Sequence, residues 1–176
     1  PGVPTMFVAM LGHPNLANFD LSSLKYCVSG GAPLSIEVKQ RFEALTGCRV
    51  VEGYGLSEAS PVVTCNPPDG PVKPGSIGQP LPGTVVSLRD LADPTREVEP
   101  GEKGEICVNG PQVTKGYWKR PEDTANQFVG AFLRTGDVAT MDDEGFIFIV
   151  DRIKDLIISS GYNVYPRRIE DALYEH

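Results

Sequence analysis

Apolar residues occur along this chain in short runs, and the first runs end in glycine or polar residues. Residues 3–11 (VPTMFVAML) carry apolar side chains at helical spacing, with Pro4 suited to a first turn, and predict a short buried helix. Residues 24–28 (LKYCV) and 49–52 (RVVE) predict two strands. A helix is predicted between these strands, at residues 35–45.

The second predicted helix has recognisable ends. Ser35 suits an N-cap, because its hydroxyl can accept from a free backbone N–H, and Gly47 suits the end of the helix. We expect the apolar residues Ile36, Phe42 and Leu45 to point inward. The order strand, helix, strand predicts a βαβ unit with parallel strands.

Glycine segments follow both predicted strands, at residues 29–32 (SGGA) and 53–55 (GYG). Carboxyl ends of parallel strands share one edge of a sheet, so we expect these segments to form two walls of one pocket. Tyr54, lifted out of regular structure, could stack on a nucleobase, while Ser57 and Glu58 suit a magnesium-bound phosphate. The alternative is an ordinary turn with a half-buried Tyr54 and Ser57 as an N-cap.

The second half of the chain is rich in turns. Proline and glycine crowd residues 61–83 and end the first unit. Short strand candidates then recur at 84–88, 104–108, 132–133, 138–141 and 146–150. Their spacing predicts a small antiparallel barrel or sheet, and Pro121 opens one short helix.

Two polar segments in this half carry candidate chemistry. Asp137, in residues 133–137 (LRTGD), presents a carboxylate that can accept from two vicinal hydroxyls, as a ribose offers. The alternative is a turn residue in a hairpin. Residues 151–162 contain a short apolar strand with charged and hydroxyl side chains on both sides. This pattern fits either a charged joint between two units or a solvated loop.

Composition narrows the class of protein. The chain has 176 residues and is 40% apolar, which predicts a globular protein. Its net charge of -7 argues against nucleic acid as a partner. This negative charge does not exclude a nucleotide that binds together with its own magnesium ion. No run approaches a transmembrane length and no leader pattern opens the chain, so we predict a cytoplasmic protein. The four cysteines lack CxxC spacing and predict reduced structural thiols.

Both ends suggest a piece of a longer chain. The sequence opens on PGVP without a methionine, and the helix predicted at 166–176 keeps an apolar face at Ile169 and Leu173. We therefore expect further sequence on both sides.

Five motifs in order resemble the adenylate-forming enzymes, which include acyl-CoA synthetases, firefly-type luciferases and peptide-synthetase adenylation domains. They are SGGAPL at 29–34, GYGLSE at 53–58, GEICVNGP at 104–111 with GYW at 116–118, RTGD at 134–137 and DRIKDLI at 151–157. The likeness is strongest to medium- and long-chain fatty acid CoA ligases. It implies an α/β fold: a βαβ portion of a sheet subdomain (1–65), a small antiparallel β-barrel subdomain (66–150), and a hinge with the start of a C-terminal α+β domain (151–176).

The resemblance also implies roles for the motif residues. Those near the base, ribose and phosphate would be Gly30, Gly31, Ala32, Gly53, Tyr54, Gly55, Leu56, Ser57, Asp137, Ile149 and Arg152. Tyr54 would stack on adenine beside Ile149, Asp137 and Arg152 would hold the ribose, and Glu58 would hold magnesium. Ser57 stands where the family usually has threonine and would bind the α-phosphate. Lys154 would lie at the hinge, and Ser160, Gly161 and Tyr162 beside the pantetheine tunnel.

The implied reaction joins a fatty acid to coenzyme A through an acyl-adenylate, with ATP and Mg²⁺. The family's loop for the β- and γ-phosphates and its adenylation lysine are not in this sequence, so we expect the piece itself not to turn over. Alternatives are a luciferase-like or peptide-synthetase enzyme, or a non-catalytic nucleotide-binding or interaction module. Acyl-chain length, oligomeric state and peripheral contact of the parent with a membrane stay open.

Overall fold

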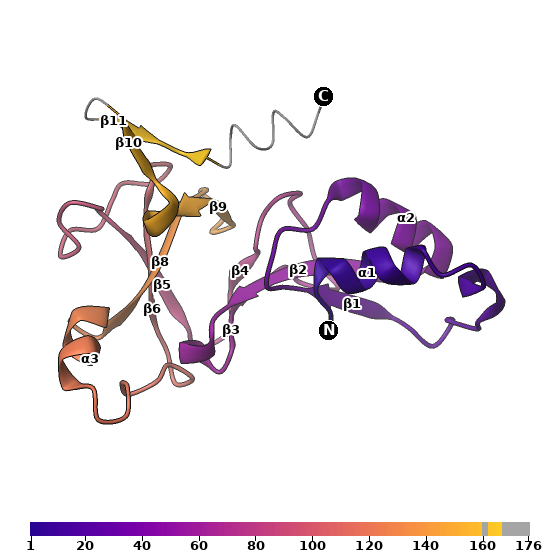
Figure 1. The fold of residues 1–176 in the computed structure, drawn as a ribbon, viewed down its shortest axis with the longest axis horizontal. Helices are drawn as coiled ribbons and strands as arrows, with labels where there is room; N and C mark the ends of the chain where they lie inside the picture. The colour runs from indigo at the N-terminus through magenta and orange to yellow at the C-terminus, as the bar shows by residue number, and fades with distance from the viewer. Residues whose placement is uncertain (160–161, 167–176) are drawn as a thin grey trace. The chain divides into compact units, whose positions relative to one another are not determined.

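The computed structural model describes residues 1–159 and 162–166, and the chain divides into two compact units, Pro1–Leu81 and Pro82–His176 (Figure 1). Residues 66–81 belong to the first compact unit, and the subdomain boundary at residue 65 that the resemblance implies stays a prediction. Asn66 helps to tie residues 66–81 to this unit, because its N–H donates to the Glu52 carbonyl at 2.8 Å and its side-chain amide donates to the Ser76 carbonyl at 2.6 Å.

The first unit contains the predicted βαβ arrangement. Its elements are α1 (Pro4–Leu11), η1 (Leu16–Asn18), β1 (Tyr26–Ser29), α2 (Ile36–Thr46), β2 (Arg49–Gly55), η2 (Ser57–Ala59), β3 (Val62–Cys65) and β4 (Gln79–Pro80). Strands β1 and β2 are parallel, with Tyr26 opposite Arg49. The sheet order is β1-β2-β3-β4, in which β3 and β4 are antiparallel to their neighbours. The βαβ prediction is confirmed.

The second glycine segment is not a loop, which corrects one expectation. Gly53, Tyr54 and Gly55 are the last residues of β2 and pair with β3, with Tyr54 opposite Thr64. A neighbouring strand satisfies the backbone groups here, so Tyr54 lies within regular structure. The register shifts between Tyr54 and Gly55, and this bulge ends the pairing.

The core of the first unit lies between its helices and β2. Phe7 of α1 and Phe42 of α2 are both buried, and their rings meet edge to face with centroids 5.0 Å apart. Leu34 and Val50 complete this cluster. The prediction of a buried α1 is correct for Phe7 and wrong for Val8, which is 52% exposed.

Helix α2 confirms its predicted ends but corrects its predicted face. Gly47 ends the helix in the left-handed conformation, with φ of 68°. Ser35 occupies the N-cap position, although its side chain makes no capping bond to any described residue. Ile36 and Leu45 are exposed, whereas Phe42 is buried. Val38 packs on the core instead, since it precedes Phe42 by four residues and shares its face.

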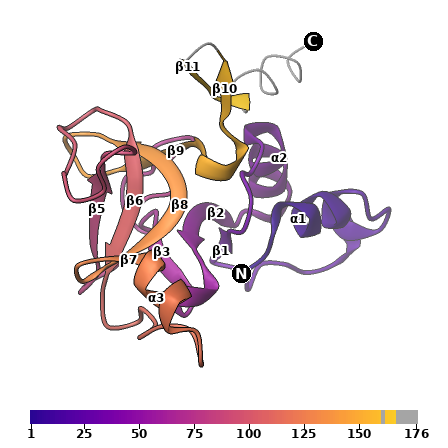
Figure 2. The same cartoon turned by 60° about the vertical axis from the view of Figure 1, so that its left-hand side comes forward.

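The second unit is built on a curled antiparallel sheet (Figure 2). Its elements are β5 (Val85–Arg89), β6 (Gly104–Asn109), α3 (Pro121–Gln127), β7 (Phe128–Val129), β8 (Phe132–Met141), β9 (Ile147–Arg152), η3 (Ile153–Asp155), β10 (Ile157–Ser159) and β11 (Tyr162–Val164). The sheet has five strands: four run in the order β5-β6-β8-β7, and the fifth, β9, pairs with β8. Strands β10 and β11 form a separate antiparallel pair. The α/β fold class with an antiparallel second part is confirmed.

Strand β8 replaces two predicted strands. The runs at 132–133 and 138–141 are the ends of one strand of 10 residues, and the polar residues 134–137 continue it. Asp137 is therefore a strand residue and not a hairpin turn. The neighbouring strand β6 is almost continuously buried. Ile106 of β6 and Leu133 of β8 are among the core side chains.

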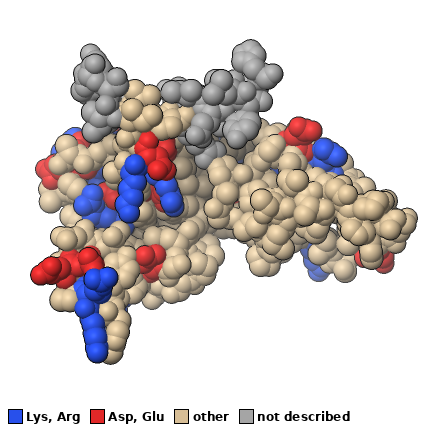
Figure 3. Space-filling view, in the orientation of Figure 1, with Lys and Arg blue, Asp and Glu red and all other residues tan. Residues whose placement is uncertain are grey.

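The surface seen in Figure 3 carries charges of both signs. None of the helices within residues 1–159 and 162–166 is both long enough and apolar enough to cross a membrane. The helix predicted at 166–176 lies, beyond Pro166, outside the described residues.

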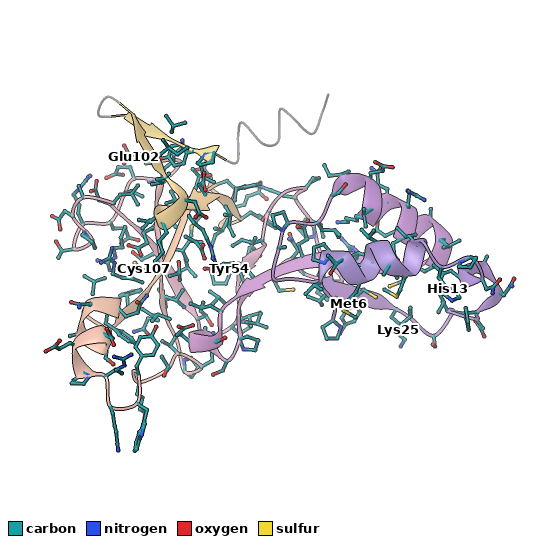
Figure 4. All side chains as sticks on the ribbon, in the orientation of Figure 1. Met6, His13, Lys25, Tyr54, Glu102 and Cys107 are labelled. Carbon is teal, nitrogen blue, oxygen red and sulfur yellow. The ribbon has the colours of Figure 1, made fainter. Side chains whose placement is uncertain are left out.

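All four cysteines are free thiols, and two of them give a testable pH dependence. Cys107 lies inside β6 (Figure 4), and the Sγ of buried Cys48 lies 3.5 Å from the Sγ of Cys27. Burial raises the pKa of Cys48 and that of Cys107 to about 12 each, because an ionised thiolate would lose its hydration.

We expect Cys48 and Cys107 of the folded chain to react with iodoacetamide at pH 8 at least about 100-fold more slowly than in denaturant, because the thiolate is the nucleophile. Mass spectrometry of a labelling time course measures this. The raised pKa values stabilise the fold fully below about pH 9, and this contribution is lost as the pH rises from about 9 towards 12. Equal rates in the folded and denatured chain would contradict the expectation.

Candidate functional site

The two glycine segments lie close together at the end of β1, whereas the pocket expected between them stays a prediction. A Cβ added to Gly30 would lie 3.2 Å from the carbonyl oxygen of Gly53, so the two backbones approach closely. Gly31 has φ of +82°, and both Gly31 and Ala32 are exposed. The buried hydroxyl of Ser29 finds no hydrogen-bond partner among the described residues. The edge therefore combines open backbone with a buried polar atom.

The end of β2 leads into a tight turn that carries a hydroxyl and a carboxylate. Leu56 donates its N–H to the carbonyl of Pro61 at 2.8 Å, which closes the turn. Within it, Ser57 is exposed, Glu58 is half-buried and Ala59 is buried. Leu56, not Ser57, is the N-cap of η2, so the alternative interpretation of Ser57 as a capping residue is wrong.

Tyr54 and Glu58 supply different chemistry from neighbouring positions. Tyr54 is half-buried on β2, where Figure 4 labels it. Within residues 1–159 and 162–166 there is no cluster of three or more metal-ligating side chains. A single carboxylate nevertheless suits magnesium bound with a nucleotide, because the ion keeps several waters and takes its other ligands from phosphate oxygens. Glu58 fits that donor set.

In the second unit, β8 and β9 bring two predicted residues into contact. Asp137 stands opposite Arg152 in the register, and the Nε of Arg152 donates to Oδ1 of Asp137 at 2.9 Å. Asp137 is only 5% exposed, whereas the Arg152 side chain is 69% exposed. The N–H of Asp137 also donates to Oγ1 of Thr135 at 3.1 Å. The aspartate is thus held in a defined orientation.

A buried glutamate that we had not assigned supports this segment. Glu105 of β6 is 2% exposed and accepts from the Nε of Arg134 at 2.9 Å and from Nη2 of Arg134 at 2.8 Å. Its other oxygen accepts from the N–H of Gly136 at 3.0 Å. Glu105 therefore fixes the stretch of β8 from Arg134 to Gly136, just before Asp137. The signal in the sequence was one acidic residue inside an otherwise apolar strand.

The remaining predicted residues are spread over the second unit. Ile149 is half-buried on β9 opposite Ala139, and Lys154 is exposed in η3. Ser160 and Gly161 lie outside the described residues, and of Tyr162 only the backbone, at the start of β11, is described.

Comparison with known proteins decides the family. The model of the AMP-binding enzyme family matches residues 1–118, more than half of the chain. The chain belongs to the AMP-binding enzymes. The resemblance seen in the five motifs is confirmed.

Two long-chain-fatty-acid CoA ligases are close relatives of this AMP-binding enzyme. The one from Bacillus subtilis (strain 168) is 55% identical over 100% of this chain, and the one from Escherichia coli O157:H7 is 48% identical over 99%. The chain spans 31% of the length of each ligase, so it corresponds to about a third of those proteins.

A solved structure shares the fold. It is the O-succinylbenzoate coenzyme A synthetase MenE from Bacillus subtilis in complex with ATP and a magnesium ion, and it matches with a TM-score of 0.85 and 33% sequence identity. The match covers 99% of this chain and 35% of that one.

Proposed function

We propose that this chain is the nucleotide-binding portion of an ATP-dependent long-chain fatty acid CoA ligase. The observation that carries the proposal is the 55% identity to a long-chain-fatty-acid CoA ligase over the whole chain, which includes all five motifs. The Asp137–Arg152 pair and the Ser57–Glu58 turn add support, because both present polar groups that a nucleotide requires.

In the first unit, we assign base and phosphate recognition to neighbouring residues. Tyr54 offers an aromatic face, and stacking on a base contributes about 1–3 kcal/mol. The small residues Gly31 and Ala32 leave the backbone open to a flat ligand. Ser57 would donate its hydroxyl to the α-phosphate. Glu58 would hold Mg²⁺, which supplies charge stabilisation at that phosphate when it is bound.

In the second unit, we assign ribose recognition to Asp137 and Arg152. An ionised carboxylate accepts only, so it suits the two hydroxyls of a ribose. The guanidinium of Arg152 holds Oδ1 of Asp137 at 2.9 Å and keeps the carboxylate oriented before any nucleotide arrives. Such preorganisation lowers the entropic cost of binding.

The proposed reaction has two steps. The fatty acid carboxylate attacks the α-phosphorus of ATP and expels pyrophosphate, which gives an acyl-adenylate. The thiol of coenzyme A then attacks the acyl carbonyl and expels AMP. Polar donors fixed around the α-phosphate stabilise the charge that develops there, and no covalent bond to the protein is required. Exposed Lys154, in η3, would serve the rearrangement between the two steps.

Binding of AMP by isothermal calorimetry tests the proposal. We expect Asp137→Asn to weaken AMP binding about 30-fold, because a charge-assisted hydrogen bond contributes about 1.5–3 kcal/mol. We expect Tyr54→Ala to weaken it about tenfold through lost stacking. Asp123→Asn is the matched control, because that carboxylate is exposed on α3 and its removal should leave AMP affinity unchanged.

Two results would count against this function. One is the absence of AMP binding at millimolar concentration by a chain whose circular dichroism is that of a folded α/β protein. The other is binding that neither Asp137→Asn nor Tyr54→Ala weakens.

A further inference from the structure

The loop that leads into α3 presents an unusually exposed aromatic residue. Trp118 is 87% exposed, more than any other large apolar side chain among the described residues, and it is the one tryptophan of the chain. We call residues 115–120 (KGYWKR) the Trp118 loop. An indole ring of this size is rarely left in water without a use, since covering it removes a large apolar area.

Positively charged residues lie on both sides of Trp118 in the sequence. Lys115, Lys119 and Arg120 are all exposed, in a chain whose net charge is -7. Arg120 is paired with Asp123 at 3.4 Å, whereas neither Lys115 nor Lys119 forms an ion pair with any residue that the structure describes. The Nζ of Lys119 lies 6.0 Å from the centroid of the Trp118 ring. Figure 3 shows blue side chains projecting at the lower edge of this unit.

The Trp118 loop is held in shape by α3. The N–H of Tyr117 donates to Oγ1 of Thr124 at 2.9 Å, and that hydroxyl donates to the carbonyl of Arg120 at 2.8 Å. Gly116 has φ of +137° and lies so close to Thr124 that a Cβ there would be 2.5 Å from its Cγ2. Lys119 is one of two described non-glycine residues with positive φ, at 55°. A loop fixed in this way loses little entropy when it binds.

A shallow hollow of about 490 Å³ adjoins the indole. Tyr117, Trp118, Pro121 and Ala125 line it, and so do Lys115 and Lys119. Aromatic and apolar residues therefore share this hollow with two lysines.

We propose that the Trp118 loop docks on the anionic surface of a lipid bilayer. Tryptophan prefers the boundary between the headgroups and the acyl chains, where its ring is apolar and its N–H stays wet. Lysines beside it are attracted by anionic headgroups. A nucleic acid fits less well, because a long polyanion would meet the net negative charge of the chain, whereas a bilayer needs to meet only the loop.

A tryptophan that is unique in the chain makes the test direct. We expect the emission of Trp118 to shift to the blue when vesicles of phosphatidylcholine and phosphatidylglycerol (1:1) are added, and brominated acyl chains to quench it. Vesicles of phosphatidylcholine alone should bind several-fold more weakly. Lys115→Gln and Lys119→Gln should each weaken partitioning about fivefold, and the double variant more than either one.

The control variant is Lys25→Gln, because Lys25 (labelled in Figure 4) is an exposed lysine of the first unit. It should leave partitioning unchanged. Trp118→Ser, followed by vesicle flotation, should reduce binding about tenfold. Circular dichroism establishes that each of these lysine and tryptophan variants is folded. Their AMP affinity should equal that of the unchanged chain. Membrane binding needs neither ATP nor Mg²⁺. It can therefore fail while AMP binding is kept, and AMP binding can fail while membrane binding is kept.

Three results would overturn the proposal: no emission shift with anionic vesicles, equal partitioning into neutral and anionic vesicles, or full binding by the Lys115→Gln/Lys119→Gln variant. An emission shift that a soluble acidic protein produces and anionic vesicles do not would assign the loop to a protein partner instead.

Discussion

Replacing Glu105 by alanine is expected to lower the free energy of unfolding of the second unit by about 3 kcal/mol or more. The carboxylate is 2% exposed and satisfies both Arg134 and the N–H of Gly136. Its loss leaves a guanidinium whose side chain is only 30% exposed without its counter-ion, and it leaves a backbone donor unpaired. Urea unfolding followed by circular dichroism gives the free energy.

Two further variants separate the charge from the packing. Asp123→Asn removes an exposed partner of Arg120 and should cost less than about 1 kcal/mol. The double variant Glu105→Leu/Arg134→Met should recover part of the lost stability, because it removes both charges together. A loss for Glu105→Ala as small as that for Asp123→Asn would show that the buried pair contributes little. If AMP binds through Asp137, Glu105→Ala should also weaken AMP binding.

Replacing Gly55 by alanine is expected to destabilise the first unit by about 3 kcal/mol and to displace the turn that follows it. A Cβ at this position would lie 1.9 Å from the carbonyl oxygen of Pro61. That carbonyl belongs to the backbone and accepts from Leu56, so it cannot move without breaking the turn that carries Ser57 and Glu58.

Gly12→Ala is the matched control for this substitution. A Cβ on Gly12 would make only ordinary contact, at 3.5 Å from the carbonyl oxygen of Val8, and φ there is -79°. We expect a change of less than about 0.5 kcal/mol. Amide hydrogen exchange of residues 56–61 reports the displaced turn in Gly55→Ala. Exchange and stability equal to those of the Gly12→Ala variant would show that the backbone absorbs the methyl group.

Local patterns in the sequence predicted the βαβ unit well. Gly47 and Ser35 delimited α2, and the apolar runs on either side gave parallel strands. The turn chemistry of these residues acts within a few positions of the chain, so it can be inferred without knowing what packs where.

Interactions between distant segments explain the rest. Glycines at 53 and 55 suggested a loop, but β3 pairs with them and extends β2 through both. Similarly, Gly136 interrupted the apolar pattern of β8, although Glu105 of β6 binds its N–H and holds the strand together. The inward face of α2 was assigned from apolar character alone, and Val38 took the place expected for Ile36. The spacing of apolar residues along the sequence does not indicate which strand lies next to a given residue.

The pairing of β8 has a consequence for how fast the second unit folds and unfolds. Its hairpin with β9 joins nearby residues, such as Met141 and Ile147, whereas its ladder with β6 joins Gly104 to Ala139 and must close a long loop that contains α3. Short loops close first, so the hairpin forms early and the β6 ladder late. The Glu105–Arg134 ion pair belongs to that late ladder. Breaking it should therefore shorten the lifetime of the native state while leaving the refolding rate nearly unchanged.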